Sequence, residues 1–194
     1  MNNFCRSRLL LDVPVQFYSD EFNLEGLDSL PDICRDAGEQ AEFDCIIDFL
    51  INSHEEEDDE DDGDLGEATP CQQRLLMHVH QRYAMSRTGQ RDMRDRQARS
   101  WWGECPRHHC SRFGLLPYGP SSSTGQAGLY GFCPKCKQIY KLKGNNNHPS
   151  EQLDGAWYGP NACMLVALSM PEWHDPNGAK YTPRIFGFRL AHSQ

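Results

Sequence analysis

Two stretches in the first half of the chain have the hydrophobic spacing of amphipathic helices. In residues 39–51 the apolar positions recur at i, i+3, i+4 and i+7, namely at Phe43, Ile46, Ile47 and Leu50. The second stretch begins with Thr69 as a cap, Pro70 at the first helical position and Gln72 completing a capping box. Its apolar side comprises Leu75, Leu76, Val79 and Tyr83. We expect this helix to be broken at Gly89.

The remaining hydrophobic pattern is less regular. Residues 1–14 are predicted to be a mobile lead-in, and residues 22–27 a short helical turn that glycine stops. Residues 129–132 and 138–142 are typical of strands. The continuous apolar run 162–168 fits a buried strand or a buried helix, because its periodicity does not separate the two.

Alternation returns near the end of the chain, where residues 181–190 are predicted to form an extended edge strand or a hairpin arm. Its aromatic face would carry Phe186, Phe188 and Leu190. Either the core of this protein covers that face, or the strand docks onto another chain. The pattern alone leaves both readings open.

Four cysteines add a candidate metal site to this picture. Cys105 and Cys110 form one close pair, Cys133 and Cys136 form another, and 22 residues separate the two pairs. Such spacing lets four thiolates reach one tetrahedral zinc ion and leaves no position for a catalytic water. We therefore predict one structural Zn²⁺ per chain. Two disulfides or free thiols are the alternatives.

One acidic run dominates the charge of the chain. Nine acidic residues occupy positions 55–64, so that 19 acidic and 19 basic residues remain outside them, against a formal net charge of −9. Such a run is predicted to be an exposed loop, either a solvated linker or a binding site for basic peptides, polyamines or divalent ions. Its acidic residues are Glu55, Glu56, Glu57, Asp58, Asp59, Glu60, Asp61, Asp62 and Asp64.

The chain shows neither a signal peptide nor a run long enough to span a bilayer, so we expect a cytoplasmic and nuclear protein. The five further cysteines would then stay reduced, as small buried hydrophobic residues: Cys5, Cys34, Cys45, Cys71 and Cys163. No catalytic motif is present, and we predict that the protein is not an enzyme.

Two basic segments raise the possibility of nucleic-acid binding. Arginines between residues 91 and 99 alternate with Asp92 and Asp95, which fits an exposed helix with local ion pairs better than a phosphate-binding surface. A zinc-ribbon nucleic-acid-binding protein is the main alternative function. It would use Phe132 or Tyr140 for base stacking and, for phosphates, Arg107, Lys135, Lys137, Lys141 and Lys143.

The chain as a whole resembles the regulatory (beta) subunits of casein kinase II. The resemblance covers about residues 17–192 and is specific in combination. The residues that carry it are, in chain order, Phe22-Asn23-Leu24, Gly26-Leu27, His80, Arg82-Tyr83, Cys105-Pro106-Arg107, Cys110, Leu116-Pro117, Gly119, Cys133-Pro134-Lys135-Cys136, Asp154-Gly155-Ala156, Pro183-Arg184 and Phe186-Gly187-Phe188.

The resemblance implies an α+β fold, in which a helical N-terminal part precedes a zinc-binding region with a small three-stranded antiparallel sheet. It implies a mainly helical domain 1–100 with the acidic loop 55–64, a zinc-binding dimerisation domain 101–170 and a docking segment 171–194. Zinc is expected to fix the fold of the pairing surface, with apolar residues such as Leu115, Leu116 and Ile139 nearby.

The same resemblance implies a non-catalytic regulator of a serine/threonine protein kinase. Two copies would pair through the zinc region, and each would help to hold a catalytic kinase subunit in a heterotetramer. Ile185, Phe186 and Phe188 would contact that subunit, which favours docking over internal coverage of the aromatic face. The acidic loop would bind basic substrates or polyamines. Two departures are that residues 1–7 lack the serine cluster of the family and that residue 186 is phenylalanine where tyrosine is usual.

Overall fold

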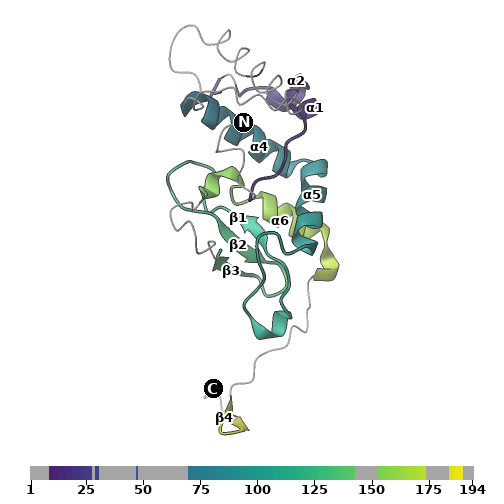
Figure 1. Ribbon diagram of the computed structural model, residues 1–194, viewed down its shortest axis with the longest axis vertical. Helices are drawn as coiled ribbons and strands as arrows, with labels where there is room; N and C mark the ends of the chain where they lie inside the picture. The colour runs from purple at the N-terminus through teal and green to yellow at the C-terminus, as the bar shows by residue number, and fades with distance from the viewer. Residues whose placement is uncertain are drawn as a thin grey trace, which may run out of the picture.

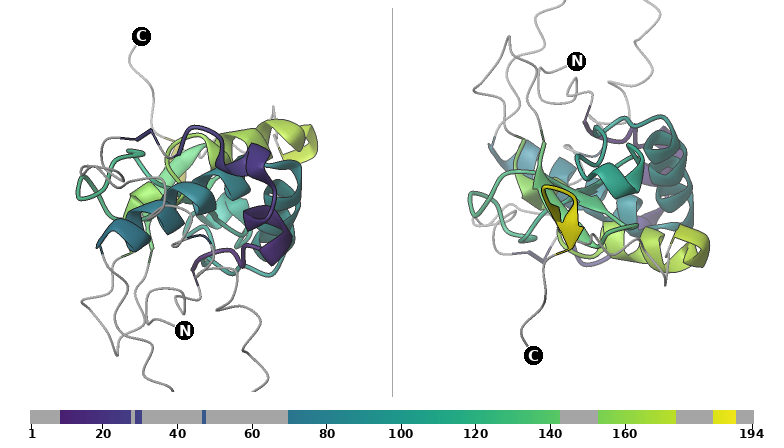
Figure 2. Two further views of the ribbon diagram at one scale, coloured as in Figure 1. Left: turned by 90° about the horizontal axis from the view of Figure 1, so that it is seen from above. Right: turned by 90° about the horizontal axis from the view of Figure 1, so that it is seen from below.

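The predicted α+β architecture is present in the computed structural model, which describes residues 9–27, 29–30, 47, 70–142, 153–173 and 184–189. Figure 1 shows α1, α2 and α4 at one end, a small sheet in the middle with α5 and α6 beside it, and a separate hairpin at the other end. Figure 2 (right) views the sheet from the hairpin side. No helix in these described ranges is long and apolar enough to cross a membrane.

The helices are short at the start of the described chain and longer after residue 70. They are α1 (Val15–Tyr18), α2 (Glu21–Leu24), α4 (Pro70–Met85), α5 (Arg87–Ala98) and α6 (Ala162–Ser169). Three 3₁₀ turns are η2 (His108–Cys110), η3 (Gly155–Trp157) and η4 (Pro171–Trp173). As predicted, α4 begins at Pro70, and a glycine with positive φ, Gly26, follows α2.

The prediction that Gly89 breaks the second helix is wrong. The chain leaves α4 after Met85, and Ser86 caps α5 by accepting a hydrogen bond from the Gly89 backbone N–H. Gly89 is needed for a different reason. A Cβ atom at this position would lie 1.9 Å from the Tyr83 carbonyl oxygen, so only glycine allows the first turn of α5 to approach the end of α4 this closely.

The sheet is antiparallel, in the order β1 (Leu116–Tyr118), β2 (Tyr130–Cys133), β3 (Gln138–Lys141). The register pairs Leu116 with Phe132 and Phe132 with Ile139. These strands confirm the two predicted around the second cysteine pair, within one residue at each end. The ambiguous run 162–168 is the helix α6, which buries Ala162, Cys163, Val166 and Ala167.

The prediction of a mobile lead-in is wrong for residues 9–14, and residues 1–8 lie outside the described ranges. Leu10, Leu11 and Val13 are buried in the main core. The backbone here is also held by hydrogen bonds, because the Leu9 carbonyl accepts from Trp102 Nε1 at 2.9 Å and from the Tyr158 hydroxyl at 2.6 Å. These partners are far away along the chain, which explains why the local pattern failed.

One core joins the helices to the sheet. Its buried residues run from Leu10 through α4 and β1 to α6, and thus include residues on both sides of the predicted boundary at residue 100. That boundary stays a prediction. Of the apolar stripe predicted for residues 39–51, only Ile47 is described, as a buried helical residue, and the rest lies outside the described ranges.

The arginine-rich stretch 91–99 belongs to α5 and the residue that follows it, and this helix is exposed on one side and buries Met93 and Gln97 on the other. One local ion pair of the expected kind is present. Arg94 lies 4.0 Å from Asp95, and both side chains are exposed. Arg96 points the other way. It pairs with Asp12, donates to the Leu10 carbonyl and lies over the Trp101 ring at 5.1 Å. Arg96 therefore anchors the N-terminal segment and does not present its charge to a phosphate backbone.

His80 on α4 ties together three segments that are distant in sequence. The Leu11 backbone N–H donates to His80 Nε2 at 3.0 Å, and Nδ1 lies 2.8 Å from the Trp157 carbonyl oxygen. A backbone N–H can only donate and a carbonyl can only accept, so these partners define the neutral tautomer with its proton on Nδ1. Burial lowers the pKa of His80 from 6.5 to about 4, and the Trp157 carbonyl opposes part of this shift.

Lowering the pH is therefore expected to destabilise the fold through His80. The unfolded chain binds a proton at this residue below a pKa near 6.5, whereas the folded protein binds it only near pH 4. The contribution of His80 to the free energy of unfolding is thus fully present above pH 6.5, and it is lost as the pH falls toward 4. We expect a loss of about 1 kcal/mol between about pH 7.5 and about pH 5.5. Urea unfolding at both values measures it.

The matched control is His80→Gln, which keeps a donor and an acceptor but does not titrate in this range. Protonation of cysteine ligands affects both proteins alike, so the difference between their pH profiles isolates His80. Parallel profiles for the two proteins would contradict this role.

Candidate metal centre and exposed hairpin

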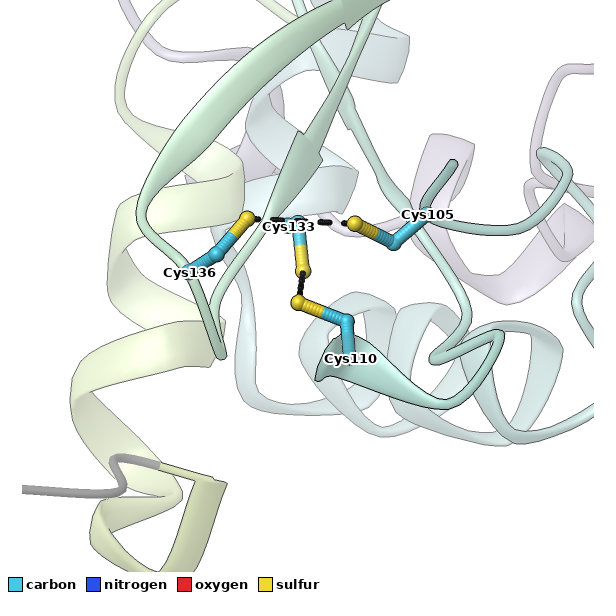
Figure 3. Close-up of side chains that lie close together, drawn as sticks. All are labelled: Cys105, Cys110, Cys133 and Cys136. Atoms are coloured by element: carbon cyan, nitrogen blue, oxygen red, sulfur yellow. Dashed lines mark hydrogen bonds between the residues drawn. The ribbon is translucent and has the colours of Figure 1, made fainter. Parts of the chain in front are cut away.

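Four cysteine side chains converge beside the sheet (Figure 3). Their Sγ atoms all lie within 4.8 Å of one another. Cys105 precedes η2, Cys110 ends η2, Cys133 ends β2, and Cys136 lies in the turn before β3. The structure thus brings together all four predicted metal ligands, from two segments that are separated in the sequence.

The sulfur–sulfur distances fit a tetrahedral thiolate site. Cys105 Sγ and Cys136 Sγ are 3.8 Å apart, and Cys110 Sγ and Cys133 Sγ are 4.0 Å apart. Sulfurs placed about 2.3 Å from a central ion at the corners of a tetrahedron would be separated by about 3.8 Å. The four cysteines can therefore hold a metal ion. Because protein sulfur fills every position, the site is of the closed, structural type.

Two tight turns create this geometry. In the first, the Cys105 N–H donates to the Phe113 carbonyl at 2.8 Å, and Ser111 and Arg112 have positive φ values of 53° and 58°. In the second, the Lys137 N–H donates to the Cys133 carbonyl at 2.8 Å, and Lys137 has φ 57°. Left-handed non-glycine residues cost about 1 kcal/mol or more each, and metal ligation can offset this cost.

The four thiols of the site cannot all lose their protons unless a cation is bound among them. Burial, with the neighbouring thiols, raises the pKa of Cys110 to about 11, and burial raises that of Cys133 still further. Burial also acts to raise the pKa of Cys136. Hydrogen bonds outweigh it and lower this pKa to about 7, the largest effect coming from Tyr140 and smaller ones from the other cysteines. A bound divalent cation would supply the positive charge that lets all four thiols become thiolates.

Tyr140 is a site residue to which sequence reasoning gave a different role. Its hydroxyl oxygen lies 3.3 Å from Cys136 Sγ, and its ring packs on the cluster formed by Cys105, Cys110, Leu115 and Cys133. The alternative nucleic-acid-binding function uses this ring for base stacking. Its position in a predicted strand, four residues after the last cysteine, could have placed Tyr140 near the metal site. The direction of its side chain could be known only from the register of β3.

The residues that were predicted to lie near the pairing surface, or to stack on bases, differ in how far they are buried. Leu115 and Leu116 are buried within this chain, whereas Ile139 on β3 is 47% exposed. The pairing surface itself stays a prediction. Phe132 is also buried, because it faces the core from β2. Neither Phe132 nor the half-buried Tyr140 is thus displayed as a stacking platform. Lys143 and the acidic residues 55–64 lie outside the described ranges.

A second candidate site is a hairpin formed by β4 (Arg184–Ile185) and β5 (Phe188–Arg189). The prediction of one extended strand over residues 181–190 is wrong at its centre, because the chain reverses at Phe186 and Gly187. Both have positive φ, 50° and 86°, as in the tight turns that suit two-residue hairpins. The hairpin lies beyond the sheet, apart from the helices (Figure 1).

The hairpin exposes the apolar side chains that were predicted to contact a partner. Phe186 at the turn is 97% exposed, Phe188 is 79% exposed and Ile185 is 54% exposed. Ile185 pairs with Phe188, and Arg184 pairs with Arg189. Since cross-strand partners share a face and successive residues alternate, one face is apolar and the other is basic.

Comparison with known proteins assigns the chain to a family. The sequence matches the casein kinase II regulatory subunit family over residues 1–189. It is 31% identical over 180 residues to the suppressor-of-stellate-like protein of Drosophila melanogaster, covering 92% of this chain and 71% of that protein. It is 25% identical over 191 residues to casein kinase II subunit beta' of the same species, covering 96% and 81%. Against casein kinase II subunit beta of Schizosaccharomyces pombe the identity is 28% over 180 residues, covering 92% and 72%.

Proposed function

Because the chain belongs to the casein kinase II regulatory subunit family, we propose that it is a non-catalytic regulator of a serine/threonine protein kinase. In this proposal two copies pair through the metal-binding region, and each helps to hold a catalytic subunit in a heterotetramer. The observation that carries the proposal is the hairpin of residues 184–189, which displays two phenylalanines and an isoleucine to solvent.

The metal in this proposal is one structural Zn²⁺ per chain. It is supported by the four-sulfur donor set and by Sγ separations of 3.8 and 4.0 Å, which match a zinc–thiolate tetrahedron. Bound zinc would stabilise the two turns and hold β2 and β3 against the segment 105–113. The protein would use this ion for folding, since four protein ligands leave no position for a reacting water.

Docking through the hairpin is supported by its exposure and its shape. Large apolar side chains at the turn of a protruding hairpin can enter a pocket of a partner without rearrangement of the body of the protein. The basic face formed by Arg184 and Arg189 leaves the apolar face free for contact. Pairing of two copies would use the exposed surface around the metal site, where Ile139 offers an apolar contact.

We also propose that the acidic residues 55–64 attract basic substrates or polyamines, because nine carboxylates in ten positions create a strong local negative potential. Such attraction is screened by salt. Spermine binding that did not change with salt concentration would argue against it. A cytoplasmic and nuclear location completes the proposal, and it is supported by the four clustered thiols, which bind a metal only while they stay reduced. Disulfides among these four cysteines in the protein isolated from its source cells would argue against it.

The function is tested by mixing the purified protein with the catalytic subunit of casein kinase II and measuring intact complexes by native mass spectrometry. We expect two copies of each chain and one zinc ion per copy of this chain. The protein alone should show no phosphotransferase activity above a blank. A metal-free monomer that stays separate from the catalytic subunit would refute the proposal.

A further inference from the structure

The four sulfurs of the metal centre are not equally protected. Cys105, Cys110 and Cys133 are buried, whereas Cys136 is only half-buried. Cys136 lies in the turn between β2 and β3, and it is followed by the exposed residues Lys137 and Gln138. A reagent in solution therefore reaches the site most readily at Cys136.

This more accessible sulfur has a contact partner outside the cysteine set. Tyr140 Oη lies 3.3 Å from Cys136 Sγ, within hydrogen-bonding distance for sulfur. The sheet positions this partner, because Tyr140 is on β3 and pairs with Gly131 of the neighbouring strand β2. The ring also packs on the buried cluster around the sulfurs, so the hydroxyl is held where it is.

A hydroxyl at this position has a direct effect on a metal-bound thiolate. A thiolate can only accept, so the Tyr140 O–H donates to Cys136 Sγ and draws electron density from its lone pairs. Partners that hydrogen-bond to metal ligands orient them and set their reactivity. The sulfur most open to solvent is thus the one to which this side chain donates.

We propose that Cys136 is the modification site through which thiol-directed electrophiles enter the metal centre, and that Tyr140 is a positioning residue that slows this attack. The metal-bound state rests on the function proposed above. If that function holds, modification of Cys136 would release the ion and weaken the region through which two copies pair.

The step can be written for a maleimide. The Cys136 sulfur uses a lone pair to attack one carbon of the maleimide double bond, and a carbon–sulfur bond forms. The neighbouring carbon takes a proton from water, which leaves hydroxide. The product is a neutral thioether, which is a weak zinc ligand. A zinc ion held by the four cysteines would then keep three thiolate ligands, those of Cys105, Cys110 and Cys133, and a chelator could remove it.

The experiment treats the full-length zinc-loaded protein with substoichiometric N-ethylmaleimide and maps the adducts by peptide mass spectrometry. A chromogenic chelator reports zinc release at the same time. Among the four ligands, the first adduct is expected on Cys136, and zinc release should follow its appearance. In Tyr140→Phe both rates should rise about fivefold, the equivalent of one net hydrogen bond.

The matched control is Tyr130→Phe, which removes a hydroxyl from the neighbouring strand β2 but lies outside the cluster around the sulfurs. It should react like the unmodified protein. A loosened fold would expose all four cysteines together, whereas the proposed role changes the relative labelling of Cys136. First modification at another ligand, or equal rates for Tyr140→Phe and Tyr130→Phe, would overturn the proposal.

The same measurements separate this proposal from the proposed function. If the isolated protein holds one zinc but labels first at Cys105, Cys110 or Cys133, only the present inference fails. If it holds no zinc at all, the structural role of the metal fails and this inference fails with it.

Discussion

Replacing Cys133 by serine is expected to abolish zinc binding and to unfold the metal-binding half of the protein. Cys133 is fully buried at the end of β2, and its replacement leaves three thiolate ligands. A serine hydroxyl is a much weaker zinc ligand than a thiolate. Structural zinc contributes roughly 10–16 kcal/mol of apparent binding free energy in small zinc modules. Loss of even half of this is comparable with the whole stability of an ordinary domain.

Metal content by elemental analysis and urea unfolding followed by far-ultraviolet circular dichroism measure this effect. The matched control is Cys163→Ala, which removes an equally buried thiol from α6, outside the metal centre. It should retain one zinc per chain and lose only about 1 kcal/mol or less. A Cys133→Ser variant that kept its zinc and unfolded like the control would contradict the assignment of the site.

The second large effect is expected at the hairpin. Phe186→Ala and Phe188→Ala should each weaken binding to the catalytic subunit by about 2 kcal/mol or more, equivalent to about thirtyfold in Kd. The reason is that each ring is exposed in the free chain and would become buried only in the complex. Isothermal titration calorimetry with the catalytic subunit measures the change.

A suitable control is Phe22→Ala. Phe22 and Phe188 are both 79% exposed, but Phe22 lies on α2 at the opposite end of the molecule (Figure 1). All three variants should unfold like the parent protein, because exposed rings contribute little to the core. Equal affinity for Phe188→Ala and Phe22→Ala would show that the hairpin is not the docking element.

The two sites differ in what made them predictable. The metal ligands could be found from spacing, because a tight turn between two cysteines is a local feature and the chemistry of thiolates restricts what such a set can bind. The aromatic residues near the end of the chain could be found from alternation, but only the resemblance favoured their exposure over coverage by the core. Their turn could not be found in this way, since Phe186 is not a residue that favours positive φ, and only the pairing of Ile185 with Phe188 requires the reversal there.

The sequence by itself determined the features that depend on neighbouring residues: the four-cysteine set, the start of α4 at Pro70, the strands β2 and β3, and the family to which the chain belongs. Only the tertiary structure decided which of several equally apolar residues are buried. Leu10 and Leu11 are covered by partners that follow tens of residues later, and His80 is neutral because burial in the same core lowers its pKa. Burial depends on contacts between distant segments, and local spacing carries no information about them.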